Sequence, residues 1–426
     1  MIFLYRILTI ALYPFLILLI YFRIFLNKED KKRFKEKIFS SKFNVKKNEK
    51  NFLIWFHAAS IGELKSILPI IEELNKKNLD YEFLITTVTL SSGNLANEKL
   101  RKFKNVCHRY FPLDTEFLIK KFLKSWKPKA IFLVESEIWP NLILNAKKLN
   151  IPIAIINARI TNRSFKKWTV FSKASQKIFN SFDLALVSNT ETEEYLKKLN
   201  VKNIFYTGNI KILEKPKIIL NKNFADKILE KKRFWLAAST HEGEEKFCLK
   251  THIQLKENFK DIITIIAPRH INRVKKISNL CEKLKLNTQI LQKEDSINSG
   301  KEIIIVNSFG ILSRFFSHST SVLMGKSILK KFRDVGGQNP LEAARYGCKI
   351  YHGPYVYNFS EIYEILNKNN ISKLINTIEE LSYNLKIDLN DFKKNEKSLS
   401  FLDVLEKSTM DTIIGKIEFF LNNANK

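Results

Sequence analysis

Two short apolar segments in the first half of the chain are each followed by acidic residues. The segment 52–56 leads into His57-Ala-Ala-Ser60-Ile-Gly62-Glu63, and the segment 130–134 leads into Glu135-Ser136-Glu137. A carboxylate in the first turn of a helix can accept a proton from a substrate hydroxyl. Burying acids at the end of a strand costs free energy, which favours a functional role for them. For Glu63, spacing alone favours a simpler account, a favourable charge at a helix N-terminus. For Glu135 and Glu137, capping of the next helix is an equally good explanation.

Basic residues follow other segments of the same kind. Gly208 permits an unusual backbone turn before Lys211, which can reach a phosphate, although a solvated lysine is the simpler account in this lysine-rich chain. Arg269 stands in Ala267-Pro268-Arg269-His270, where its rigid guanidinium fork can pair with a phosphate or lie on the surface. The sequence therefore offers candidate acids early and candidate anion ligands later.

The most specific motif is Gly336-Gly337-Gln338-Asn339-Pro340-Leu341-Glu342. Asn339 is a good N-cap and Pro340 a good first helical residue, so the motif predicts a helix that begins at Pro340. A capped helix does not explain the two glycines, which allow close approach of the backbone to a ligand. A nucleotide phosphate would lie at the helix N-terminus, and Glu342 would accept hydrogen bonds from ribose hydroxyls. By contrast, capping alone explains most of Ser239–Glu245.

These motifs lie between segments that alternate between strand and helix patterns. Apolar runs typical of fully buried strands are separated by amphipathic stretches, which predicts parallel sheets with helices on both faces. Ligands bind beyond the carboxyl ends of such strands, where the polar motifs fall. The series breaks near Gly208, so we expect two doubly wound, Rossmann-like α/β domains, residues 27–208 and 209–400, followed by a helical segment at 401–426. The strands are expected at Phe52–His57, Glu82–Thr87, Ala130–Val134, Pro152–Ile156 and Asp183–Val187, and at Phe234–Ala238, Ile262–Ala267, Glu302–Val306, Ser321–Met324 and Lys349–Tyr351.

An apolar stretch occupies the N-terminus. Residues 7–22 carry no charge and lie between Arg6 and Arg23, and the apolar character resumes after Arg23. We expect residues 1–26 to form one membrane-anchor helix, either tilted across a bilayer or lying in its interface. A cleaved secretory signal is the alternative, but no matching cleavage site follows. The basic run that begins at Lys28 indicates that the following domains are cytoplasmic, and it would bind anionic lipid.

The chain is strongly basic. It has 72 lysines and arginines against 43 aspartates and glutamates, which gives a net charge of +29 over 426 residues. Such a charge attracts anionic lipids, sugar phosphates or nucleic acid, but an AT-rich genome explains the lysines equally well. No nucleic-acid-binding motif accompanies the charge, so no nucleic-acid partner is expected. The four cysteines and seven histidines are scattered without metal-ligand spacing, so no metal or other cofactor is expected.

Together these motifs resemble the Kdo transferase family, whose members transfer 3-deoxy-D-manno-octulosonic acid (Kdo) from CMP-Kdo to lipid A precursor. The resemblance extends to about Ile365 and includes Thr86–Gly93, Asn157–Arg159 and Ser188–Glu191. Two doubly wound domains facing across a cleft form the glycosyltransferase-B (GT-B) architecture, which agrees with this resemblance. The resemblance also implies an inverting transfer to lipid IVA without metal, in lipopolysaccharide synthesis at the inner membrane.

The resemblance assigns roles to particular residues. Glu63 matches the catalytic base that takes a proton from the acceptor hydroxyl. Glu135 and Lys211 match positions assigned to stabilisation of the transition state. The residues that match CMP-binding positions are Pro268, Arg269, Phe309, Gly310, Ile311, Asn339, Pro340, Leu341 and Glu342.

Four positions depart from the family pattern. Family members usually have an acid at the position of Ile311 and a glycine at the position of Lys326, histidine in place of Gln338 and aspartate in place of Asn307. The change at Ile311 removes a side-chain partner for the nucleotide, whereas Lys326 can add a phosphate contact. These changes leave two alternatives open: another lipid glycosyltransferase with a different nucleotide sugar, and a homologue that binds a nucleotide sugar without turnover.

Overall fold

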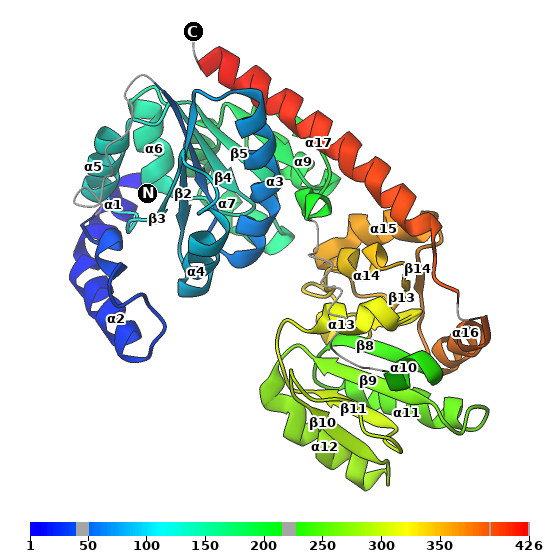
Figure 1. The fold of residues 1–426 in the computed structure, drawn as a ribbon. Helices are drawn as coiled ribbons and strands as arrows, with labels where there is room; N and C mark the ends of the chain where they lie inside the picture. Colours follow the sequence, from blue (N-terminus) through cyan, green and yellow to red (C-terminus); the bar gives the residue numbers. More distant parts are fainter. Residues whose placement is uncertain (40–50, 215–226, 392, 425–426) are drawn as a thin grey trace. The chain divides into compact units, whose positions relative to one another are not determined.

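The computed structural model describes residues 1–39, 51–214, 227–391 and 393–424. The chain divides into two compact units, of which the first comprises Met1–Glu214 with Glu406–Lys426 and the second Lys215–Leu405. The division lies just beyond the boundary expected at Gly208. Within the described residues, each unit holds a seven-stranded parallel sheet with helices on both faces, which confirms the predicted pair of Rossmann-like domains (Figure 1).

The sheet of the first unit is built mainly from the segments predicted as buried strands. Its interior strands are apolar along both faces, so helices can cover each side and neighbouring strands can run parallel. The strand order is β3-β2-β1-β4-β5-β6-β7, in which the direction of winding reverses between β1 and β4. The strands are β1 (Phe52–His57), β2 (Tyr81–Thr87), β3 (Val106–Tyr110), β4 (Ala130–Val134), β5 (Ile153–Ala158), β6 (Leu184–Val187) and β7 (Ile204–Tyr206).

Amphipathic helices cover both faces of this sheet. In α5, Ile119 and Phe122 lie one turn apart and are buried, and the Phe122 ring is 4.8 Å from that of Trp55 in β1. Burying such a side chain contributes about 1.5–3 kcal/mol. One face carries α3 (Ile61–Lys77), α4 (Leu90–Lys99), the 3-10 segment η3 (Ile210–Leu213) and the end of α17 (Lys397–Ala424), and the other α5 (Glu116–Trp126), α6 (Pro140–Lys148), α7 (Asn162–Val170), α8 (Ser172–Phe179) and α9 (Thr190–Lys198).

The sheet of the second unit has the order β10-β11-β9-β8-β12-β13-β14, and its winding reverses between β8 and β12. Its strands are β8 (Phe234–Thr240), β9 (Ile263–Pro268), β10 (Thr288–Leu291), β11 (Ile303–Val306), β12 (Ser321–Met324), β13 (Lys349–His352) and β14 (Ser372–Leu374). Its helices are α10 (Lys227–Lys231), α11 (Glu244–Lys256), α12 (Val274–Lys283), α13 (Leu312–His318), α14 (Leu341–Arg345), α15 (Ser360–Lys368), α16 (Ile378–Asp391) and the start of α17. The segment predicted at 401–426 belongs to α17, whose residues from Glu406 onward are part of the first unit.

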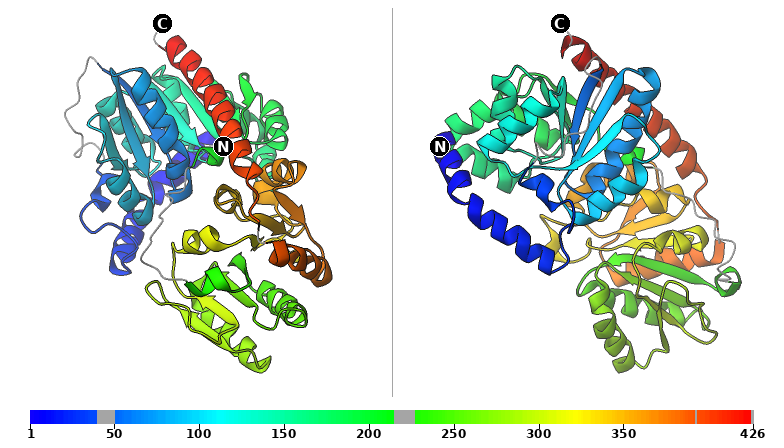
Figure 2. Two further views of the ribbon diagram at one scale, coloured as in Figure 1. Left: turned by 45° about the vertical axis from the view of Figure 1, so that its right-hand side comes forward. Right: turned by 60° about the vertical axis from the view of Figure 1, so that its left-hand side comes forward.

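The N-terminal stretch differs from the single helix that was predicted. It forms two helices, α1 (Ile2–Ala11) and α2 (Tyr13–Phe25), bent by 52° (Figure 2). Pro14 lies in the first turn of α2, where it has no N–H to donate to the preceding turn. Among the described residues no single helix combines the length and apolar character that a membrane crossing needs; α1 and α2 meet that criterion only when counted together.

The chain after α2 returns along the edge strand β3. The 3-10 segment η1 (Phe34–Lys37) follows Arg33, whose Nη2 donates to the carbonyl of His108 at 3.0 Å. Glu36 Oε2 accepts the backbone N–H of Tyr110 at 2.9 Å, and the side chains of Arg33 and Glu36 also bond to each other at 2.7 Å. Two side chains thus form hydrogen bonds with backbone groups of β3 that could otherwise pair with another strand.

Candidate active site

In doubly wound sheets the strand-order reversal leaves a crevice beyond the carboxyl ends of two strands, where ligands bind. In the first unit this point lies between β1, which ends at His57, and β4, which ends at Val134. In the second it lies between β8, which ends at Thr240, and β12, which ends at Met324. The polar motifs recognised in the sequence fall at both points.

Glu63 lies in the first turn of α3, immediately after β1. Ser60 is the N-cap and accepts the backbone N–H of Glu63 at 3.3 Å. In return, the Ser60 hydroxyl donates to Glu63 Oε1 and the Ala59 N–H donates to Oε2, both at 2.8 Å. Glu63 therefore closes the capping turn of its own helix, whereas the simpler sequence account expects only a favourable charge at the helix N-terminus. Its side chain is nevertheless held at the carboxyl edge of the sheet.

The surroundings of Glu63 also fit it for proton transfer. Burial, helped by the nearby charges of Glu137 and Glu135 and opposed by the hydrogen bonds from Ser60 and Ala59, raises the pKa of Glu63 to about 7. A carboxyl group with this pKa exchanges protons near neutral pH, which is the property of an effective general base. Capping and catalysis are therefore compatible for this residue.

Glu135 and Lys211, which the resemblance gives a shared role, lie in contact although they are far apart in the chain. Lys211 Nζ lies 2.7 Å from Glu135 Oε1. Asn157 at the end of β5 donates its amide to the same oxygen at 3.3 Å and accepts the backbone N–H of Ile210 at 3.1 Å. Both Glu135 (φ +57°) and Asn157 (φ +53°) occupy the left-handed region, a strain that often accompanies functional sites.

His57 and Glu137 lie at the same edge of the sheet. Glu137 is the second of the two acids noted after the predicted strand 130–134, whereas spacing assigned no role to His57. Thr86 Oγ1 accepts from the indole of Trp55 and lies 2.9 Å from His57 Nδ1, so its own proton is available to that nitrogen. His57 Nε2 lies 3.3 Å from Glu137 Oε2, which also accepts from Trp139 Nε1 at 2.8 Å. Burial opposes ionisation of Glu137, but His57 and Trp139 together hold its pKa below the usual value. A charged Glu137 is thus maintained beside Glu63.

In the second unit, the corresponding acid is Glu244, in the first turn of α11. Its side chain is fully buried and accepts four backbone N–H groups, one from its own turn and three from the loop after β12. The carboxylate therefore joins the ends of β8 and β12. The donors are His241 (2.9 Å), Lys326 (2.6 Å), Ser327 (2.8 Å) and Ile328 (3.1 Å).

A group of cations lies at the same edge. Burial lowers the pKa of Lys326, and the charge of Arg269 lowers it further. Burial, with Lys326, His270 and Arg269 nearby, lowers the pKa of His241 to about 4, so this imidazole is neutral at physiological pH. Arg269 follows Pro268 at the end of β9, and its backbone N–H donates to Thr240 at 3.0 Å. The positive charges of Arg269 and Lys326 form a site suited to an anion.

The glycine-rich motif differs from its predicted role in one respect. Gly336 and Gly337 face the chain's own backbone: a Cβ on Gly336 would collide with the carbonyl of Tyr355, and a Cβ on Gly337 would be in tight contact with Val356, at 3.0 Å. Gly337 also has φ +89°, which other residues rarely adopt. The glycines are thus required for packing of this loop. The backbone N–H of Gly337 also donates to the carbonyl of Lys326 at 2.7 Å.

The residues after the glycines begin a short helix. Asn339 Oδ1 accepts the N–H of Leu341 at 3.0 Å, and α14 starts at Leu341 rather than at Pro340. Asn339 and Glu342 are half-buried, so both retain surface that a ligand can contact. The motif therefore places these two polar side chains on a loop that is fixed by its glycines.

The remaining candidates precede α13. Phe309 is 63% exposed, Gly310 has φ +78°, and Ile311 is buried at the start of the helix. An apolar side chain suits this buried position of Ile311. In the described parts of the chain, no group of three or more His, Cys, Asp or Glu side chains could hold a metal ion.

Sequence comparison identifies the family. A family model described as 3-deoxy-D-manno-octulosonic-acid transferase (kdotransferase) matches residues 32–213. The chain is 30% identical to a 3-deoxy-D-manno-octulosonic acid transferase of Rickettsia prowazekii, over 89% of this chain and 82% of that protein. This chain belongs to the Kdo transferase family. An enzyme of the same name from Haemophilus influenzae is 31% identical over 74% of this chain and 73% of its own length.

Solved structures support the fold of this Kdo transferase. A glycosyltransferase from Rickettsia africae superposes with a TM-score of 0.59 at 13% identity, covering 89% of this chain and all of that one. A UDP-GlcNAc 2-epimerase from Neisseria meningitidis gives 0.55 at 14% identity, covering 88% and 100%. At this identity the likeness concerns the fold, which is the paired α/β arrangement of GT-B-like proteins.

Proposed function

We propose that this Kdo transferase moves Kdo from CMP-Kdo to lipid IVA with inversion, at the cytoplasmic side of the inner membrane. The observation that carries the proposal is the position of Glu63, a carboxyl with a pKa near 7 at the strand-order reversal of the first unit. Family membership supplies the sugar, and the cationic edge of the second unit suits a nucleotide phosphate.

In the proposed reaction, a hydroxyl oxygen of the acceptor sugar forms a bond to the anomeric carbon of Kdo. Glu63 takes the hydroxyl proton, and the bond from the anomeric carbon to the phosphate oxygen of CMP breaks. Attack opposite to the departing phosphate inverts the anomeric centre. The Glu135–Lys211 pair stabilises the transition state, and Arg269 and Lys326 offset the charge that develops on CMP.

The remaining second-unit candidates have separate parts in this proposal. Asn339 and Glu342 are expected to hold the ribose of the nucleotide, because both are half-buried polar residues at the start of α14. Pro268, Phe309, Gly310, Ile311, Pro340 and Leu341 shape the backbone around the nucleotide.

The test is mass spectrometry of lipid product. Full-length protein with CMP-Kdo and lipid IVA is expected to give a heavier lipid, and Glu63→Gln is expected to abolish this product. Glu73→Gln, on the exposed side of the same helix α3, is the matched control and should retain activity. Normal turnover by Glu63→Gln would remove the base assignment.

Donor identity has its own test, because Ile311 and Lys326 depart from the family pattern. Isothermal titration of the full-length protein with CMP and with UDP is expected to show preference for CMP. Preference for UDP would replace the donor in this proposal but leave the family unchanged. Binding of CMP without product would indicate a homologue that has lost turnover.

A further inference from the structure

The two N-terminal helices have one side against the first unit and one side open to solvent. The less exposed positions recur every three or four residues through both helices, so they form one continuous stripe that the bend does not interrupt. This stripe consists of Ile2, Tyr5, Arg6, Thr9, Tyr13, Leu16, Ile17, Ile20, Arg23 and Ile24.

Helix α1 is fixed to the unit by polar contacts. The Tyr5 hydroxyl donates to Asp114 Oδ2 at 2.8 Å. Asp114, just after β3, is buried and also accepts the backbone N–H groups of Asn141 and Leu142 at the start of α6, both at 3.0 Å. Arg6 lies 3.3 Å from Glu116. The beginning of the apolar stretch is therefore attached to the carboxyl edge of the sheet.

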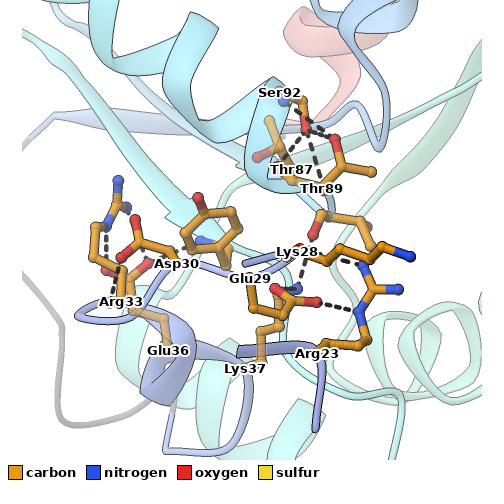
Figure 3. Close-up of polar contacts among 12 residues, drawn as sticks. Arg23, Lys28, Glu29, Asp30, Arg33, Glu36, Lys37, Thr87, Thr89 and Ser92 are labelled. Carbon is orange, nitrogen blue, oxygen red and sulfur yellow. Dashed lines mark hydrogen bonds and ion pairs between the residues drawn. The ribbon is translucent and has the colours of Figure 1, made fainter. Parts of the chain in front are cut away.

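Helix α2 is attached at its other end. Ile20 packs with Phe34, which follows the turn after the helix. Arg23 Nε donates to Glu29 at 2.9 Å, and Lys37 Nζ lies 2.6 Å from the other oxygen of the same carboxylate (Figure 3). Glu29 and Lys37 are both buried, so this ion pair is a fixed part of the unit. Both helices are thus held along their length.

A series of hydrogen bonds connects this attachment to the candidate base. Lys37 Nζ donates to the carbonyl of Val88 at 2.8 Å. The Val88 N–H donates to Ala59 at 3.2 Å, and the Ala59 N–H donates to Glu63 at 2.8 Å. Hence the helices lie beside the same edge of the sheet that carries the candidate catalytic carboxylate.

The open side of the pair is apolar. Phe3, Phe15, Phe22 and Phe25 are 76%, 64%, 58% and 81% exposed, with leucines and isoleucines between them. Contiguous apolar surface of this kind marks an interaction site. The adjacent turn carries four exposed lysines, which make an anionic partner favourable. These are Lys28, Lys31, Lys32 and Lys35.

We propose that α1 and α2 lie in the plane of an anionic bilayer rather than crossing it, with their phenylalanine side in the acyl region. A crossing helix would have to separate Tyr5 from Asp114 and Arg6 from Glu116, leaving a buried carboxylate without one of its donors. Lying in the plane keeps these contacts and covers the apolar side, as interfacial helices do. The carboxyl edge with Glu63 is then held next to the lipid surface.

This inference deepens the membrane location in the proposed function, but it can fail independently because its tests need neither donor nor acceptor. The first test uses Cys107→Ser protein with one new cysteine on a short Gly-Ser extension of the N-terminus, added to sealed phosphatidylglycerol vesicles from outside. The other three cysteines are buried. A membrane-impermeant maleimide is expected to label the new thiol without detergent. A Lys28→Cys variant is the control and should be labelled under the same conditions. Labelling of the N-terminal thiol only after detergent would overturn the inference.

The second test measures partitioning of full-length variants onto the same vesicles. Phe22→Glu and Phe25→Glu are each expected to weaken binding about tenfold or more. Lys31→Gln should weaken it about fivefold, and phosphatidylcholine vesicles should bind less. Leu79→Glu, at an equally exposed apolar residue after α3, is the control and should have no effect. Equal losses from Leu79→Glu and Phe25→Glu, or no loss from either phenylalanine variant, would also overturn the inference.

Discussion

The two units place a glutamate at the same point of the same kind of sheet, yet the surroundings of the two carboxylates differ. Glu63 accepts one backbone N–H and one hydroxyl and lies near two other acids. Glu244 accepts four backbone N–H groups and is fully buried. The difference teaches that the donors and charges around a carboxylate, rather than its place in the fold, decide whether it can exchange a proton near neutral pH.

The sharpest way to break this comparison is to remove each carboxylate and measure stability. Glu244→Ala leaves four buried or part-buried N–H groups without their acceptor, and we expect a loss of about 4 kcal/mol in the free energy of unfolding. Chemical denaturation of the full-length protein measures this. Glu63→Ala should cost less, because fewer donors lose their partner. Equal losses would mean that both acids are structural.

In activity, unlike in stability, we expect the larger loss from the substitution of Glu63. Glu63→Gln is expected to lower kcat/KM by at least about 100-fold in the assay of lipid product.

The same substitution is expected to raise the free energy of unfolding at alkaline pH, whereas Glu63→Ala lowers it. A carboxyl with a raised pKa stabilises the fold while protonated, and that contribution is lost as pH rises through about 7. At pH 8 the Glu63→Gln protein, which is neutral at this position, should therefore be more stable than wild type, by about 1–3 kcal/mol, in thermal or denaturant unfolding.

The neighbouring acids provide a finer test. In the wild type, kcat/KM should rise with pH through a value near 7 as Glu63 loses its proton. Glu137→Gln removes a negative charge beside it, so the rise should move to lower pH, by about one unit. Glu73→Gln on the outer side of α3 should leave the profile unchanged. An unshifted profile in Glu137→Gln would mean that Glu137 does not act on Glu63.

The smallest expected effect concerns the cations of the second unit. Lys326→Gly removes one charge near Arg269. We expect CMP to bind about three- to tenfold more weakly in isothermal titration, with the difference shrinking at high salt. Lys330→Gly, which lies outside this group, is the control. Tighter binding of CMP by Lys326→Gly would show that Lys326 obstructs the nucleotide.

Much of the fold could be predicted because interior strands carry an unambiguous signal. Runs such as Ala130–Val134 are apolar on both faces, and they proved to be central strands. The edge strands were missed for the opposite reason: Val106–Tyr110 contains Cys, His and Arg, and Ser372–Leu374 is too short for a pattern. Their position depends on pairing with a neighbour, which local sequence does not encode.

The candidate site was predicted in part for a related reason. Acids and bases at strand ends were visible in the sequence, but contacts between distant segments were not. The glycines at 336 and 337 were expected to admit a ligand, yet they admit backbone, because the segment at 355–356 packs there. The bend between α1 and α2 could have been inferred from Pro14, which is the one local signal within that apolar stretch.

The side chains of Arg33 and Glu36 along β3 have a consequence for solubility. An open edge of a parallel sheet can recruit a strand from a second molecule and start aggregation. Here a guanidinium and a carboxylate bond to His108 and Tyr110 in its place. The connection that leads out of the apolar helices therefore also guards the sheet against intermolecular strand addition.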